Sequence, residues 1–164
     1  MRTKSHILIF ISLFFVGGMA NASAAKDFTL ADFHSATQLV SLNDFEGKVV
    51  YLDFWASWCK PCRTSFGWMN EMQTKYAEKG FEVISINLDN DKALITTFLE
   101  RYPANFRILL DPEGSVAKDY KLVGMPSSYL IDKHGNLRKT HTGFFIKNKK
   151  QYEDEIISLL SELE

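Results

Sequence analysis

Cysteine is scarce in this sequence: only Cys59 and Cys62 occur among its 164 residues. Two cysteines are too few for a small domain held together by disulfides, and they fall short of the four ligands of a structural zinc site. A surplus of one charge sign is also missing, because 19 Lys and Arg residues face 20 Asp and Glu residues and the net charge is -1 at pH 7. Proteins that bind nucleic acid through its phosphates usually carry a basic surplus, so we expect no nucleic-acid partner.

Long hydrophobic runs are missing as well. The longest run, Ile7 to Val16, follows a positively charged start and falls short of the ~20 apolar residues that a spanning helix needs. Small residues after the run offer cleavage after Ala22 or after Ala24, which is typical of a secretory signal peptide over residues 1–24. The alternative is an uncleaved membrane anchor. We expect cleavage, no membrane insertion of residues 25–164 afterwards, and an exported, periplasmic or extracytoplasmic protein in a disulfide-permissive compartment.

The whole sequence, with 164 residues and 46% hydrophobic content, has enough apolar material for one well-packed domain and too little length for two. Residues 26–44 suit a short N-terminal hairpin or an extended arm, and strands and helices alternate after this segment. The apolar patterns predict strands over Lys48–Trp55, Phe81–Leu88, Arg107–Leu110, Pro126–Ile131 and Leu137–Phe144, and helices over Pro61–Lys79, Asp91–Tyr102, Ser115–Tyr120 and Asn148–Leu163. This order predicts an α/β fold with a central mixed β-sheet flanked by helices, antiparallel at the final hairpin.

The cysteine pair lies where a buried strand gives way to a helix. Unpaired N–H groups and the positive end of the helix dipole at such a junction stabilise a thiolate, and Lys60 adds a cation beside Cys59. Two intervening residues place Cys62 close enough to attack a mixed disulfide formed at Cys59. The pair can therefore cycle between dithiol and disulfide, and it needs no dissociable cofactor because the sulfurs carry the two electrons.

Other readings of the pair are half of a metal site or a small stapling disulfide. A disulfide that closes so short a loop constrains the unfolded chain little, which makes it a poor staple. The placement at a strand-to-helix junction favours redox chemistry.

Two separated motifs carry a family resemblance. Phe54 to Cys62 reads Phe-Trp-Ala-Ser-Trp-Cys-Lys-Pro-Cys, and Gly124 to Asp132 reads Gly-Met-Pro-Ser-Ser-Tyr-Leu-Ile-Asp. With Gly47 to Val50 before them, they resemble the thioredoxin superfamily and, within it, the exported TlpA/ResA-like thiol:disulfide oxidoreductases. The resemblance implies a thioredoxin-like fold, with the strand and helix between Leu88 and Asp111 as an insertion.

The resemblance also implies roles for single residues. Cys59 is then the attacking cysteine, Cys62 the resolving one, and Pro126 a cis-proline that faces them. The backbone of Met125 can then pair with an extended substrate strand. Independently of the resemblance, Trp55, Trp58 and Trp68 are candidates to frame a substrate groove, with packing the better expectation for Trp55. The implied partners are protein thiols and disulfides and a membrane electron-donor protein. The implied direction is reduction of exported proteins such as cytochrome c precursors.

The sequence departs from that family at one acidic position. Many TlpA/ResA-like relatives carry a glutamate three residues after the second cysteine, where this chain has Ser65. Asp53 instead matches the buried acid of ordinary thioredoxins, and it is the candidate proton acceptor for Cys62. The alternative is a partly solvated residue at a strand end, although a charge inside so apolar a run is costly.

Three further functions compete with the oxidoreductase. A copper-binding thioredoxin-fold chaperone places three residues between its cysteines, whereas this pair has two. A thiol peroxidase has a threonine three residues before its reactive cysteine, where this chain has Ala56. A redox-inert interaction module would tolerate loss of both cysteines. For His34, His134 and His141 we expect ordinary surface roles.

Overall fold

The computed structural model describes residues 23–35 and 37–162. The expected signal peptide, residues 1–24, lies outside the described residues except for its last two. Among the helices described, none combines the length and the hydrophobicity needed to cross a membrane.

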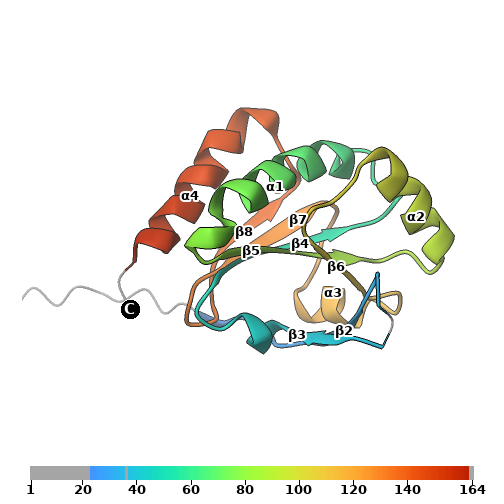
Figure 1. Ribbon diagram of the computed structural model, residues 1–164, viewed down its shortest axis with the longest axis horizontal. Helices are drawn as coiled ribbons and strands as arrows, with labels where there is room; N and C mark the ends of the chain where they lie inside the picture. The colour runs from blue at the N-terminus through green and yellow to red at the C-terminus, as the bar shows by residue number, and fades with distance from the viewer. Residues whose placement is uncertain (1–22, 36, 163–164) are drawn as a thin grey trace, which may run out of the picture.

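A mixed sheet of eight strands runs through the described part of the chain in the order β1-β8-β7-β4-β5-β6-β2-β3 (Figure 1). Strands β4, β5 and β6 pair in parallel, and the other neighbours pair antiparallel. The bounds are β1 Ser23–Ala24, β2 Thr29–Asp32, β3 Leu39–Ser41, β4 Val49–Trp55, β5 Phe81–Asn87, β6 Arg107–Leu110, β7 Ser127–Ile131 and β8 Asn136–Thr142. The predicted mixed sheet and N-terminal hairpin are confirmed.

Within residues 23–35 and 37–162, four α-helices flank the sheet: α1 Cys62–Tyr76, α2 Lys92–Arg101, α3 Ser115–Asp119 and α4 Lys149–Ser161. Figure 1 shows α1, α2 and α4 on one face and α3 on the other. Two apolar clusters match this division, one containing α1, α2 and α4 residues and the other α3 residues. The core is therefore two layers, one on each side of the sheet.

The ends of α1 and α2 follow from local chemistry. The predicted helix over 61–79 consists of α1 and a 3-10 turn, Ala77–Lys79, after which the chain turns at Gly80 with φ 85°, a conformation that favours glycine. Asp91 caps α2 because its carboxylate accepts from the Ala93 N–H at 2.8 Å. Helix α2 and strand β6 form the predicted insertion.

Strand β4 lies at the centre of the sheet, and all of its residues are buried. Its residues alternate between the two apolar clusters, as a strand covered on both faces requires. The chain leaves its carboxyl end at Trp55 and enters the segment that carries the two cysteines. The most buried strand thus leads directly to the candidate site.

Candidate functional site

Cys59 and Cys62 form a disulfide with their Cα atoms 5.4 Å apart. Cys62 is the first residue of α1 and Pro61 is its N-cap, so Cys59 lies in the preceding loop, three residues before the helix. Cys62 has no exposed surface and Cys59 is 4% exposed, whereas Trp58 is 69% exposed. Of the two cysteines, Cys59 is the more exposed.

A buried carboxylate holds the loop before Cys59 in place. The Ser57 N–H donates to Asp89 Oδ2 at 2.7 Å, and the Ser57 hydroxyl donates to Asp89 Oδ1 at 2.9 Å. Asn87, the last residue of β5, donates its side-chain N–H to Asp89 Oδ2 at 2.9 Å. The Cys59 N–H donates to the Ala56 carbonyl at 3.0 Å. The sequence analysis missed Asp89, although an acid directly after a buried strand was a visible signal.

Asp53 is the charged residue of β4, and it is 1% exposed. It lies two positions from Tyr51 and from Trp55, which pack in the same apolar cluster as Cys62, so its side chain faces the α1 side of the sheet. Burial raises the pKa of Asp53 well above its ordinary value. Its Oδ2 atom is buried without a hydrogen-bond partner among the residues described. The alternative of a partly solvated strand-end residue is therefore wrong.

The Met125–Pro126 peptide bond is cis, as the resemblance implies. Pro126 immediately precedes Ser127, which pairs with Phe54 of β4. The cis bond therefore lies at the edge of the sheet where β4 ends and the cysteine loop begins. The Pro126 carbonyl accepts from the Gly143 N–H at 2.7 Å, which holds the segment after β8 beside it.

The three tryptophans divide between core and surface. Trp55 and Trp68 are buried in the apolar cluster around α1, and only Trp58 of the three is exposed. Ser65, at the position of the relatives' glutamate, is buried and donates its hydroxyl to the Cys62 carbonyl at 2.9 Å. Ser65 thus caps a carbonyl of α1 and supplies no acid.

His141 differs from the expectation of an ordinary surface residue. Its side chain is 13% exposed, and its Nε2 atom lies 2.9 Å from Glu155 Oε2 on α4. The sequence showed only a polar strand around it. The contact depends on how α4 packs against β8, which no local pattern reveals.

The protein-family model described as Redoxin matches residues 20–156. Two relatives named thiol-disulfide oxidoreductase ResA are each 35% identical to this chain. The one from Bacillus thuringiensis subsp. konkukian (strain 97-27) aligns over 130 residues, 79% of this chain and 73% of the relative. The one from Geobacillus thermodenitrificans (strain NG80-2) aligns over 139 residues, 84% of this chain and 79% of the relative.

Solved structures agree with these relatives. A Chlorobium tepidum protein named as a thiol:disulfide interchange protein DsbE is 43% identical, with a TM-score of 0.82 over 88% of this chain and 100% of the other. The exposed lipoprotein thioredoxin Etrx1 from Streptococcus pneumoniae strain TIGR4 is 30% identical, with a TM-score of 0.69 over 82% of this chain and 100% of the other. With its thioredoxin-like sheet and its paired cysteines at the start of α1, the chain belongs to the Redoxin family.

Proposed function

We propose that this thiol:disulfide oxidoreductase works as a disulfide reductase on exported proteins, through a cycle of Cys59 and Cys62. The observation that carries the proposal is the disulfide itself, which joins the slightly exposed Cys59 to Cys62, fully buried at the start of α1. The ResA relatives and the DsbE neighbour support the same chemistry. Reduction of a substrate forms a mixed disulfide at Cys59, and attack by Cys62 then releases the reduced substrate.

The residues between the cysteines support reduction as the direction of electron flow. Thioredoxin-fold oxidants often hold the thiolate with a histidine at this place, which stabilises their reduced form. This chain has Lys60 and Pro61 there; Lys60 is exposed, and Pro61 has no side-chain donor. Equilibration with glutathione measures the reduction potential of the cysteine pair, which we expect to resemble that of thioredoxin, about -270 mV. A value of about -120 mV would make the protein an oxidant.

Cys59 is the proposed nucleophile because it is the more exposed cysteine. Cys62→Ser should accumulate mixed disulfides with substrate proteins, because the attack that releases them is lost. The matched variant Cys59→Ser should accumulate none. Mass spectrometry of the trapped adducts checks both, and the opposite pattern would exchange the two roles.

Asp53 is the proposed proton acceptor for Cys62. A thiol attacks as its thiolate, and a carboxylate whose pKa is raised by burial is a stronger base than an exposed one and can take the thiol proton. Asp53→Asn keeps the shape and removes the basic oxygen, so release of the mixed disulfide should slow by about 100-fold or more at neutral pH. Stopped-flow release kinetics measure this, and an unchanged rate would remove the role.

Trp58, Met125 and Pro126 form the proposed substrate-binding surface. A substrate in an extended conformation can pair with the backbone of Met125, and Pro126 has no N–H that would compete. Exposed apolar residues on neighbouring segments, Val123 and Phe145, widen the surface. Trp58→Ala should raise KM for a protein disulfide several-fold, which corresponds to a loss of roughly 1 kcal/mol of binding free energy. The reduction potential should stay unchanged.

Export and an electron donor complete the proposal. The positively charged start and the short apolar run support a signal peptide over residues 1–24, and a membrane protein is the proposed source of electrons. The pairing of Ser23 and Ala24 with β8 favours cleavage after Ala22, because cleavage after Ala24 would remove β1. The mass of the exported protein distinguishes cleavage after Ala22, cleavage after Ala24 and an uncleaved anchor.

A further inference from the structure

A row of three polar side chains crosses the sheet on the face that carries α1 and α4. Asp53 on β4 pairs directly with Ser128 on β7, and Ser128 pairs directly with His141 on β8. Directly opposite residues of antiparallel strands share a face, with Cβ atoms about 4.5–5.5 Å apart. Asp53 and Ser128 are buried, and His141 is mostly buried. Burial of polar groups in an apolar layer costs free energy unless the groups form hydrogen bonds.

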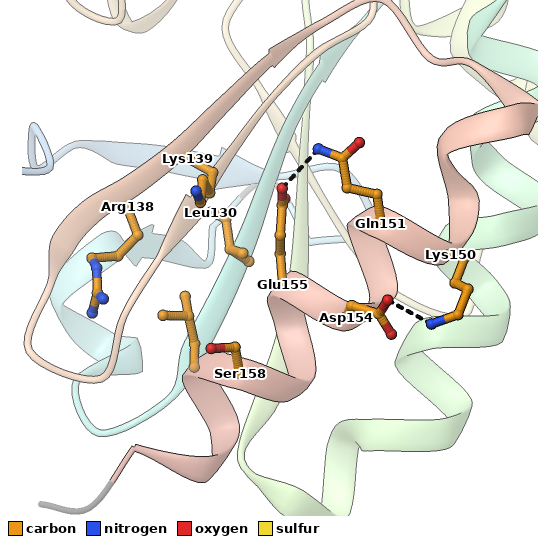
Figure 2. A pocket seen from close by; sticks show the side chains of 9 residues that line it. Leu130, Arg138, Lys139, Lys150, Gln151, Asp154, Glu155 and Ser158 are labelled. Carbon is orange, nitrogen blue, oxygen red and sulfur yellow. Dashed lines mark hydrogen bonds and ion pairs between the residues drawn. The ribbon is translucent and has the colours of Figure 1, made fainter.

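The outer end of this row reaches solvent through α4. Ser128 Oγ and His141 Nδ1 lie 3.5 Å apart, at the outer limit of a hydrogen bond, and His141 Nε2 lies 2.9 Å from Glu155 Oε2. Glu155 lines a groove of about 610 Å³ between β8 and α4. Figure 2 shows its carboxylate reaching from α4 toward β8, with Gln151 donating to Glu155 Oε1 at 3.0 Å. The row thus has one end at the buried acid Asp53 and the other at Glu155, whose Oε2 atom is buried on the His141 side and whose side chain lines the groove.

We propose that Ser128, His141 and Glu155 carry protons between Asp53 and the groove, an inference that rests on the proposed role of Asp53. Asp53 can take the proton of Cys62 only as a carboxylate, so whenever it carries a proton it must lose that proton before Cys62 can attack the mixed disulfide. Cys62, in the layer on the same face of the sheet, is fully buried and offers the proton no direct route to solvent. The row of Ser128, His141 and Glu155 offers this proton a route to solvent.

The transfer balances as a chain of single-proton steps. Asp53 gives its proton to Ser128 Oγ, whose own hydroxyl proton passes to Nδ1 of His141. The Nε2 proton of neutral His141 passes to Glu155, which releases it to water in the groove. Asp53 is left as a carboxylate and His141 as its other neutral tautomer, and no electrons are transferred. The step from Asp53 to Ser128 spans neighbouring side chains, directly or through one water molecule.

The charged surroundings suit such a role for His141. Burial lowers the pKa of His141, while Glu155 on α4 opposes this shift and Lys139 on β8 reinforces it. A neutral imidazole, which can accept on one nitrogen and donate from the other, is the form that a relay needs. Tyr152 of α4 packs against the imidazole with ring centroids 4.7 Å apart. Tyr51 of β4 also faces the row, and burial, followed by the charge of Asp53, raises its pKa, so its phenol stays protonated.

The test compares His141→Ala with His134→Ala, which alters a histidine in the turn between β7 and β8. His141→Ala should slow release of the mixed disulfide by about tenfold at neutral pH, and His134→Ala should leave the rate unchanged. Added imidazole should restore much of the His141→Ala rate, because it can enter the groove and carry the proton. Lost packing would not respond to a proton carrier, so a rate that imidazole leaves low would overturn the proposal. Glu155→Gln, which keeps the shape of α4, should slow release in the same way and serves if His141→Ala does not fold.

A double variant separates this inference from the proposed function. In the Asp53→Asn background, His141→Ala should slow release no further, because the acid that the row serves is gone. Slow release by Asp53→Asn together with a wild-type rate for His141→Ala would overturn the relay and leave the role of Asp53 intact. An unchanged rate for Asp53→Asn would overturn the role of Asp53 itself, and the relay with it.

Discussion

The two faces of β4 are equally buried but chemically unlike. Toward α3, the strand presents Val50, Leu52 and Phe54, and no acid; the Tyr129 hydroxyl in that layer donates to the Tyr120 carbonyl at 2.8 Å. Toward α1, the strand presents Asp53, whose Oδ2 atom is buried without a partner among the residues described. Burial alone does not explain the difference. Cys62 lies on the second face, and the unpaired acid lies on the face where a proton has to move.

Adding an acid to the α3 face of β4 should have the largest effect on stability. Leu52→Asp would bury a carboxylate among Val, Phe and Ile side chains, far from any proton transfer, and should destabilise the fold by about 4 kcal/mol or more. Urea unfolding measures the loss. A fully folded Leu52→Asp protein with wild-type stability would show that either face tolerates an acid, and that Asp53 is unremarkable.

Removing the acid from the α1 face should raise the free energy of unfolding at neutral pH, by less than Leu52→Asp lowers it. Burial raises the folded-state pKa of Asp53, so the folded protein binds this proton more tightly than the unfolded chain does. The contribution of Asp53 to stability is therefore complete below about pH 4, where the unfolded chain is also protonated, and it falls as the pH rises through the folded pKa.

Asp53→Asn has no such proton to lose. Its free energy of unfolding should match that of the wild type in acid and exceed it at neutral pH, with the difference growing across that window. Paired denaturation curves at several pH values check this. A difference that shrinks as the pH rises would mean that the folded protein favours the carboxylate.

The smallest expected effect concerns Ser85 on β5, the strand that neighbours β4 on the side away from β7. Ser85 is the register partner of Asp53 there. Its Oγ atom is also buried without a partner among the described residues. Ser85→Ala removes a hydroxyl that gains nothing in the fold, so stability should stay within about 1 kcal/mol of the wild type or rise. A loss of more than that would show that Ser85 serves Asp53 as a hydrogen-bond donor, and would sharpen the picture of the acid's surroundings.

The sequence predicted the parts of the fold and site that depend on local patterns. The apolar run of β4 and Pro61 before the helix were enough to place Cys59 and Cys62 at a strand-to-helix junction. The resemblance supplied the cis bond at Pro126. The roles assigned to the individual site residues, and the signal peptide, stay predictions.

Contacts between distant segments lay beyond the sequence. The pairing of Ser128 with His141 depends on strand register, and a slip of one residue would turn His141 to the other face. A register irregularity between Leu130 and Ile131 makes that pairing harder still to foresee. The two hydrogen bonds from Ser57 to Asp89 likewise depend on how the loop folds back over the end of β5.

The central claim is that β4 carries an acid that can hold and release a proton beneath Cys62. Carbon-13 NMR of the Asp53 carboxyl, titrated in the dithiol and disulfide forms with Asp53→Asn to assign the signal, tests it most directly. We predict titration well above the ordinary aspartate value of about 4. Titration at that ordinary value in both forms would contradict the claim, because Asp53 would then be a fixed negative charge at neutral pH and too weak a base for the thiol proton.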